Sequence, residues 1–228
     1  MIQIDAFIHF VGMVAVLSPL LLTLVLGVSS LLEWKLPEER ITRLVYLTNV
    51  SGLLAVLSVL AWMLISGTRH VAIAAGDWVA IPHLYHFSFK FVYDRLSVPF
   101  AALSFVLGGT IGAFASRYMH RERGFNRFFV LYSLFILGME MTALAGTIET
   151  LFTGWELVGL SSALLVAFFQ ERPAPARNGL WVWVVYRVSD AALVLAAVVM
   201  HHLRGEGDFD RVIDRRGGDS VKWNRYAG

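Results

Sequence analysis

The sequence predicts an all-α membrane protein with about six transmembrane helices. Of its 228 residues, 57% are hydrophobic and only 16% are charged, whereas a soluble domain has about 45–50% apolar and about 25% charged residues. The apolar residues form long runs, which is the pattern of membrane helices. Basic residues gather between these runs, as they do in loops that orient membrane helices.

Six apolar runs approach or exceed the roughly 20 residues that cross about 30 Å of hydrocarbon. They cover residues 6–32, 44–66, 97–118, 128–145, 148–169 and 180–202. The fourth run is the shortest. Only Gly146 and Thr147 separate it from the fifth run, so we expect these two helices to be antiparallel neighbours.

The segments outside the runs differ in character. Gly67–Leu96 is long and contains the alternating stretch HFSFKFVYD, which predicts a β-hairpin lying against the membrane. We assign residues 1–203 to a transmembrane domain. Residues 204–228 form a polar, glycine-rich tail that we expect to be poorly ordered.

The distribution of basic residues predicts the orientation of the chain. Loops after the first, third and fifth runs hold three, four and two lysines or arginines, whereas loops after the second and fourth hold three and none. The positive-inside rule then places the N-terminus on the non-cytoplasmic side of a bacterial inner membrane. The tail conflicts with this assignment, because it carries six basic residues on the opposite side.

The composition also excludes several kinds of site and partner. The chain has no cysteine, which rules out disulfides, iron–sulfur ligation and thiolate metal sites within it. We expect no cofactor and no metal ion in this chain. Its formal net charge of +2 is too small to indicate nucleic-acid binding.

Four ionisable side chains lie inside the predicted spans: Glu140, Glu156, Arg187 and Asp190. A charge at the bilayer centre costs about 2.5–3.5 kcal/mol on insertion scales, so such residues usually face a bundle interior and mark ion or proton pathways. A rise of about 1.5 Å per residue places the three carboxylates about 15–18 Å from the cytoplasmic edge. The sequence therefore predicts a charged cluster near the middle of the membrane.

Arg187 and Asp190 are spaced i, i+3, which lets them pair on one face of a helix. Arg187 should keep one carboxylate ionised, most simply Asp190, which would leave Glu156 free to load and release a proton. We therefore assign Glu156 and Glu140 as proton-relay candidates and Arg187–Asp190 as a charged pair. The structural alternatives are a buried hydrogen-bonding role for Glu156, a helix-joining ion pair, and neutral packing of Glu140.

The fifth run carries a polar and small-residue stripe at spacings of three and four, which is one face of a helix. Its members are Glu149, Thr153, Glu156, Gly159 and Ala163. Small residues beside Glu156 leave room for water, which a proton path needs. This face is predicted to point into the bundle.

Five motifs lie between Phe91 and Asp190: FVYDRLS, FASRYM, GFNRFF, GWELVGLSSALL and RVSD. With them, the stretch from Tyr93 to His202 resembles the largest antiporter-like membrane subunit of respiratory complex I, the subunit 5 or L type. That family is related to Mrp antiporter subunits and to the membrane subunit of Dab-type inorganic carbon uptake complexes. The resemblance implies the N-terminal portion of the antiporter-like fold.

By this resemblance, Glu156 matches the family's membrane glutamate, and Arg187 and Asp190 match its charged pair on the sixth helix. The family couples this glutamate to a lysine on a later helix, and none of the six predicted spans contains a lysine. The resemblance thus implies that another chain supplies the missing helices and the lysine. This sequence departs from the family at Glu140, where an apolar residue is usual, and at Gly146, where an acid is usual.

Three functions remain open on these grounds. The first is a proton-translocating subunit of a complex I-like NADH:quinone oxidoreductase, without redox chemistry of its own, among other membrane subunits in the lipid bilayer. The second is the proton-conducting membrane subunit of an energy-coupled bicarbonate or CO2 uptake complex, paired with a zinc-containing, carbonic-anhydrase-like soluble subunit. The third is a truncated or split subunit with a scaffold role.

Overall fold

The computed structural model describes residues 2–34, 36–81, 85–204 and 207–210. Within these residues the fold is a bundle of six helices with one small sheet, which confirms the all-α membrane class. The expected poor order of the tail concerns residues that lie mostly outside the described ones. Among the helices, α1, α2, α3 and α6 are long and apolar enough to cross a membrane, and the chain is an integral membrane protein.

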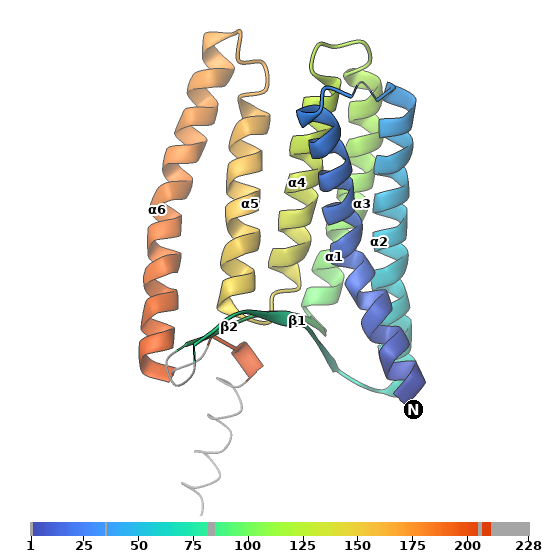
Figure 1. The fold of residues 1–228 in the computed structure, drawn as a ribbon, viewed down its shortest axis with the longest axis vertical. Helices are drawn as coiled ribbons and strands as arrows, with labels where there is room; N and C mark the ends of the chain where they lie inside the picture. Colours follow the sequence, from blue (N-terminus) through green and yellow to red (C-terminus); the bar gives the residue numbers. More distant parts are fainter. Residues whose placement is uncertain (1, 35, 82–84, 205–206, 211–228) are drawn as a thin grey trace, which may run out of the picture.

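The helices are α1 Ile2–Leu31, α2 Glu38–Ser66, α3 Ser97–Tyr118, α4 Phe125–Ala143, α5 Ile148–Val166 and α6 Pro173–Arg204. They lie side by side, with α1–α4 grouped together and α5 and α6 forming one edge of the bundle (Figure 1). Helix α6 begins seven residues before the predicted span. Proline is compatible with the first turn of a helix, because the backbone N–H that it lacks has no intrahelical partner there.

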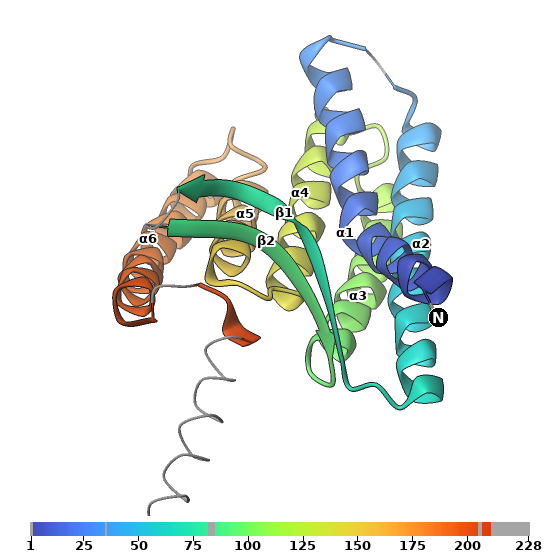
Figure 2. The ribbon, with the colours of Figure 1, turned by 60° about the horizontal axis from the view of Figure 1, so that its bottom comes forward.

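A β-hairpin crosses one end of the bundle, as the alternating sequence predicts. Strands β1 His70–Ile81 and β2 Tyr85–Asp94 pair in antiparallel register. The hairpin curves from the side of α3 toward α6, beneath the start of α5 (Figures 1 and 2). We call this end of the bundle the sheet end.

Tyr93 and Asp94 anchor the hairpin to the helices. Tyr93 is fully buried, and its hydroxyl donates a hydrogen bond to the Gly12 carbonyl oxygen in α1 at 2.7 Å. The Asp94 carboxylate accepts hydrogen bonds from the backbone N–H groups of Leu96 and Ser97 at the start of α3. Burial alone would raise the pKa of Asp94, but these hydrogen bonds hold it below its usual value. The FVYDRLS motif is therefore a joint between sheet and helix.

The tail segment 207–210 folds back onto the sheet end. The Ile148 N–H donates to the Gly207 carbonyl at 3.0 Å, and the Phe209 N–H donates to the Gly146 carbonyl at 3.1 Å. Gly146 in turn lies against β2, where an added Cβ would come within 2.9 Å of the Lys90 side chain and 3.1 Å of its carbonyl oxygen. The glycine that departs from the family pattern is thus required by this close approach.

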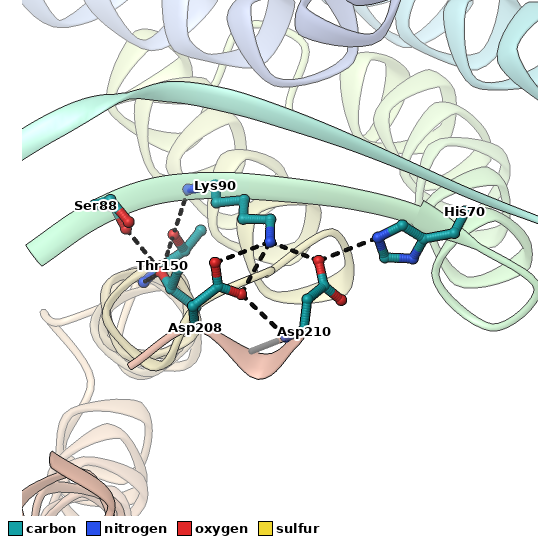
Figure 3. A network of polar contacts seen from close by, with 7 residues as sticks. His70, Ser88, Lys90, Thr150, Asp208 and Asp210 are labelled. Atoms are coloured by element: carbon teal, nitrogen blue, oxygen red, sulfur yellow. Dashed lines mark hydrogen bonds and ion pairs between the residues drawn. The ribbon is translucent and has the colours of Figure 1, made fainter. Parts of the chain in front are cut away.

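Lys90 clamps the hairpin to the tail (Figure 3). Its ammonium group donates to both oxygens of Asp208, at 2.9 and 3.0 Å, and to Asp210 at 2.5 Å. Asp210 also contacts His70 at 3.1 Å, and the Lys90 N–H donates to the Thr150 hydroxyl on α5. Lys90 thereby joins the sheet to the tail through its ammonium group and to the first turn of α5 through its backbone N–H.

Two glycines bring α4 and α5 into backbone contact. A Cβ added at Gly138 would lie 2.8 Å from the Val158 nitrogen and 2.9 Å from the Gly154 carbonyl oxygen. A Cβ at Gly154 would lie 2.7 Å from the Thr142 nitrogen. Neither backbone can move without shifting a helix, so these contacts fix the register of α4 against α5.

We predict that Gly138→Ala lowers stability by about 1–3 kcal/mol through overpacking. The control is Gly27→Ala in α1, where an added Cβ meets no atom within 4 Å. The melting temperature of the purified protein in detergent measures the effect. Equal melting temperatures for the two variants would contradict the close contact.

We predict that Lys90→Met frees the tail segment and speeds hydrogen–deuterium exchange of peptides covering residues 207–210 at least several-fold. The exposed Arg95→Met is the control. Burial lowers the pKa of Lys90, yet its hydrogen bonds to Asp210 and Asp208 raise it above the usual 10.5. The stabilisation is therefore complete below pH 10.5 and is lost only as pH rises through the higher folded-state pKa. Unchanged exchange would show that the clamp does not hold the tail.

Candidate functional site

Arg187 on α6 bridges two carboxylates that come from different helices. Its Nη2 atom lies 2.6 Å from the Glu156 Oε2 atom on α5 and 2.6 Å from the Asp190 Oδ2 atom one turn further along α6. Arginine suits this position because its guanidinium stays protonated and its long stem reaches across the helix contact. We call Glu156, Arg187 and Asp190 the charged cluster.

Aromatic residues hold the charged cluster in place. The Trp155 indole N–H donates to the Asp190 Oδ1 atom at 2.8 Å, while the Oδ2 atom forms the ion pair with Arg187 and accepts no hydrogen bond from the described residues. The Arg187 guanidinium lies 5.4 Å from the centre of the Trp183 ring, within the range of a cation–π contact. Two neighbouring residues of the GWE motif therefore contact different members of the cluster. Trp155 binds the Asp190 carboxylate on α6, and Glu156 binds the Arg187 guanidinium.

The members of the cluster differ in exposure. The side chain of Asp190 is 7% exposed, that of Glu156 is 28% exposed and that of Arg187 is 38% exposed. Helix α6 packs chiefly on α5 within the described residues, and its other sides are apolar and open. These exposed side chains are Leu180, Trp181, Val184, Val185, Val188, Val194, Leu195, Val198 and Val199. In a membrane this surface must meet lipid or other apolar helices.

Glu140 lies apart from the charged cluster. It is two residues from both Gly138 and Thr142, which contact α5, so it projects from the opposite side of α4. Its side chain is fully buried, and neither carboxyl oxygen has a hydrogen-bond partner among the described residues. Burial raises the pKa of Tyr93, and a charge on Glu140 would raise it further. The two predicted relay carboxylates therefore face different parts of the bundle.

The structure places Arg187 beside Asp190, the partner that the sequence suggested, and brings Glu156 to the same guanidinium. Spacing within one helix revealed the first contact. The contact between Arg187 and Glu156 depends on how α5 and α6 align, which cannot be inferred from residue spacing within one helix. Sequence reasoning also missed the hydrogen bond from Trp155 and a further contact of 2.7 Å between Glu149 and His201.

Two protein-family models each match part of the chain. "NADH-Ubiquinone oxidoreductase (complex I), chain 5 N-terminus" matches residues 78–129, and "NADH:quinone oxidoreductase/Mrp antiporter, TM" matches residues 145–225. Together they cover more than half of the sequence. The second match contains every residue of the charged cluster.

Individual proteins of this kind are also similar to this chain in sequence. NADH-quinone oxidoreductase subunit L of Escherichia coli K12 is 31% identical over 137 residues, which is 60% of this chain and 22% of that subunit. The probable inorganic carbon transporter subunit DabB1 of Halothiobacillus neapolitanus is 31% identical over 120 residues, which is 51% of this chain and 22% of that subunit.

The fold is similar to that of a chain in the membrane-bound sulfane sulfur reductase, an archaeal respiratory membrane complex. The TM-score is 0.65 at 14% identity, covering 89% of this chain and 38% of that one. The chain thus spans less than two fifths of the length of each of these proteins. From its motifs, its family matches and its helix arrangement, the chain belongs to the family of antiporter-like membrane subunits found in complex I and Mrp antiporters.

Proposed function

We propose that this chain is a proton-translocating, antiporter-like membrane subunit of a complex I-like NADH:quinone oxidoreductase, with Glu156 as a proton relay. The observation that carries this proposal is the sharing of one Arg187 nitrogen by Glu156 and Asp190, at 2.6 Å each. One cation and two carboxylates leave the cluster with one excess negative charge. In a low-dielectric site, such a cluster can take up one proton and become neutral.

Glu156 is the carboxylate that accepts this proton. Asp190 is held by the hydrogen bond from Trp155 and the ion pair with Arg187 and is nearly buried, whereas Glu156 is held by the hydrogen bond from Arg187 and is four times more exposed. When Glu156 is protonated, Arg187 stays paired with Asp190. The proton therefore comes and goes without leaving the guanidinium unpaired.

The charge on neighbouring helices sets the direction of this exchange. A cation that approaches the cluster favours the ionised state of Glu156, and its withdrawal favours proton uptake. The lysine that the family resemblance implies on a later helix would supply such a cation. This chain contributes no redox chemistry to that cycle, and its partners are other membrane subunits of the complex.

Glu140 remains a predicted second relay. Its full burial without a hydrogen-bond partner is costly for a carboxylate and favours the protonated group. Because it lies on the far side of α4, a role for it requires a branch toward Tyr93 and the hairpin. That branch does not run through Arg187.

A membrane topology follows from the arrangement of the loops. The N-terminus, the hairpin, the α4–α5 turn and residues 207–210 lie at the sheet end, and the arginine-rich loops lie at the other end (Figure 1). We place the arginine-rich end in the cytoplasm and the sheet end outside it, in a bacterial inner membrane. This assignment agrees with the loops and leaves the basic tail as its exception.

A second candidate is the membrane subunit of an energy-coupled inorganic carbon uptake complex. The similarity to the DabB1 subunit is as high, at 31%, as the similarity to the complex I subunit. The charged cluster would serve the same proton transfer there, with a zinc-containing, carbonic-anhydrase-like soluble partner. Identifying the subunits that copurify from native membranes separates the two: NADH dehydrogenase subunits support the first, and one large zinc protein supports the second.

We predict that Glu156→Gln lowers proton movement by at least tenfold in vesicles that contain the purified native complex. Glutamine keeps a hydrogen-bond acceptor for Arg187 but cannot carry the proton, so the yield of complex should stay unchanged. The control is Glu171→Gln, which changes an exposed acid in the turn before α6. Normal proton movement in the Glu156 variant would overturn the relay role and favour a scaffold.

We predict that Arg187→Ala lowers the yield of assembled complex as well as proton movement, because it strands two carboxylates that share this cation. Arg177→Ala, which removes an exposed arginine from the same helix, is the control. The yield of complex from membranes, followed by gel filtration, measures the effect. Equal yields for the two variants would mean that the ion pairs do not hold α6 in place.

A further inference from the structure

A second acid–base pair joins α5 to α6 at the sheet end. The Glu149 Oε1 atom lies 2.7 Å from the His201 Nε2 atom, and each side chain is only 10% exposed. The backbone of Gly207 covers the carboxylate so closely that a Cβ there would collide with it. The pair is thus shielded, although it lies within a few residues of the end of both helices.

This pair and the charged cluster lie along the same helix faces. Glu149 and Glu156 are seven residues apart on α5, which is two turns and about 10 Å of rise. His201 and Asp190 are eleven residues apart on α6, which is about three turns and again returns to one face. Thr153 lies one turn from each glutamate, with its hydroxyl bonded to the Glu149 carbonyl at 2.8 Å. The α5–α6 contact therefore holds two exchangeable sites with a hydroxyl between them.

We propose that Glu149 and His201 form a proton-exchange site that connects Glu156 to the aqueous phase at the sheet end. This inference rests on the proposed function and extends it by naming the route. A proton on His201 Nε2 passes to Glu149 Oε1, which changes the ion pair into a neutral pair without changing its net charge. His201 regains a proton from water at the sheet end, and Glu149 passes its proton through water beside Thr153 to the Glu156 carboxylate.

The residue types suit this step. Histidine gains and loses a proton in the physiological range more readily than other side chains, and a shared contact of 2.7 Å lets a proton cross without large movement. Other titratable groups at this end include Lys90, Asp208, Asp210 and His70. Of these, Lys90 contacts both aspartates, and His70 contacts Asp210. They form the clamp on the hairpin.

The first test measures proton movement in vesicles containing the native complex with Glu149→Gln or His201→Gln. Both should lower it at least tenfold, and Glu149→Asp should restore part of it. His202→Gln is the matched control, because it changes the exposed histidine at the next position and leaves the pair and its Gly207 cover in place. A purely structural pair would let an assembled Glu149→Gln complex move protons as well as the His202→Gln complex does, and that result would overturn the inference.

The outcome for Glu156→Gln separates this inference from the proposed function. If Glu156→Gln stops proton movement and Glu149→Gln leaves it within twofold of normal, the relay stands and the route is wrong. If Glu156→Gln has no effect, the proposed function itself fails. In a valid route, the double variant Glu149→Gln with Glu156→Gln is no worse than Glu156→Gln alone, since both groups act in series.

A second test asks whether water reaches Thr153. Its result remains informative even if the glutamine variants assemble poorly. The chain has no cysteine, so Thr153→Cys introduces the one thiol of this chain. It should react with 2-aminoethyl methanethiosulfonate at least tenfold faster than Leu157→Cys, whose Cβ packs against Gly138 of α4. Labelling is read from the mass of this chain. Equal rates for the two cysteines would overturn the route.

Discussion

The arrangement of α5 against α6 depends on the contacts of one guanidinium nitrogen, that of Arg187. Arg187 lies between an acid on its own helix and an acid on α5, so it joins the two helices and sets the charge of the site at once. A single carboxylate would have left a neutral, inert ion pair. Two carboxylates leave one negative charge in excess, and in a low-dielectric environment that excess is what makes proton uptake favourable. The Trp155 N–H binds Asp190, so this carboxylate is held by a second group besides Arg187.

The remainder of the fold holds α5 in the register that this contact needs. Gly138 and Gly154 let α4 approach α5 backbone to backbone, and Gly146 lets β2 lie against the turn between them. The Lys90 clamp then ties the hairpin and the tail segment to the first turn of α5 (Figure 3). These three glycines therefore position a charge without touching it. A helix displaced by one residue would turn Glu156 by about 100° and out of reach of α6.

How much of this the sequence predicts depends on the range of each interaction. The helices and the hairpin follow from local periodicity, and Arg187–Asp190 follows from a spacing of three within one helix. The link to Glu156 and the contact between Glu149 and His201 depend on the relative height of two helices, which local patterns do not encode. Glu140 shows the same limit. Its depth along α4 was predictable, but the face it occupies followed only once Gly138 and Thr142 were seen against α5.

Under the proposed function, the open side of α6 affects how strongly proton transfer can be driven. Its apolar side chains, including Val188 next to Arg187, are exposed in the described part of the chain. An apolar neighbour that covers them removes water from the charged cluster, and the lower dielectric strengthens every charge interaction there. Under such cover the excess negative charge responds strongly to any cation brought near it and weakly to bulk salt. A site that is too exposed would exchange protons freely with solvent and could not be driven. The surface that remains apolar on α6 is therefore as necessary to a driven proton relay as the charges themselves.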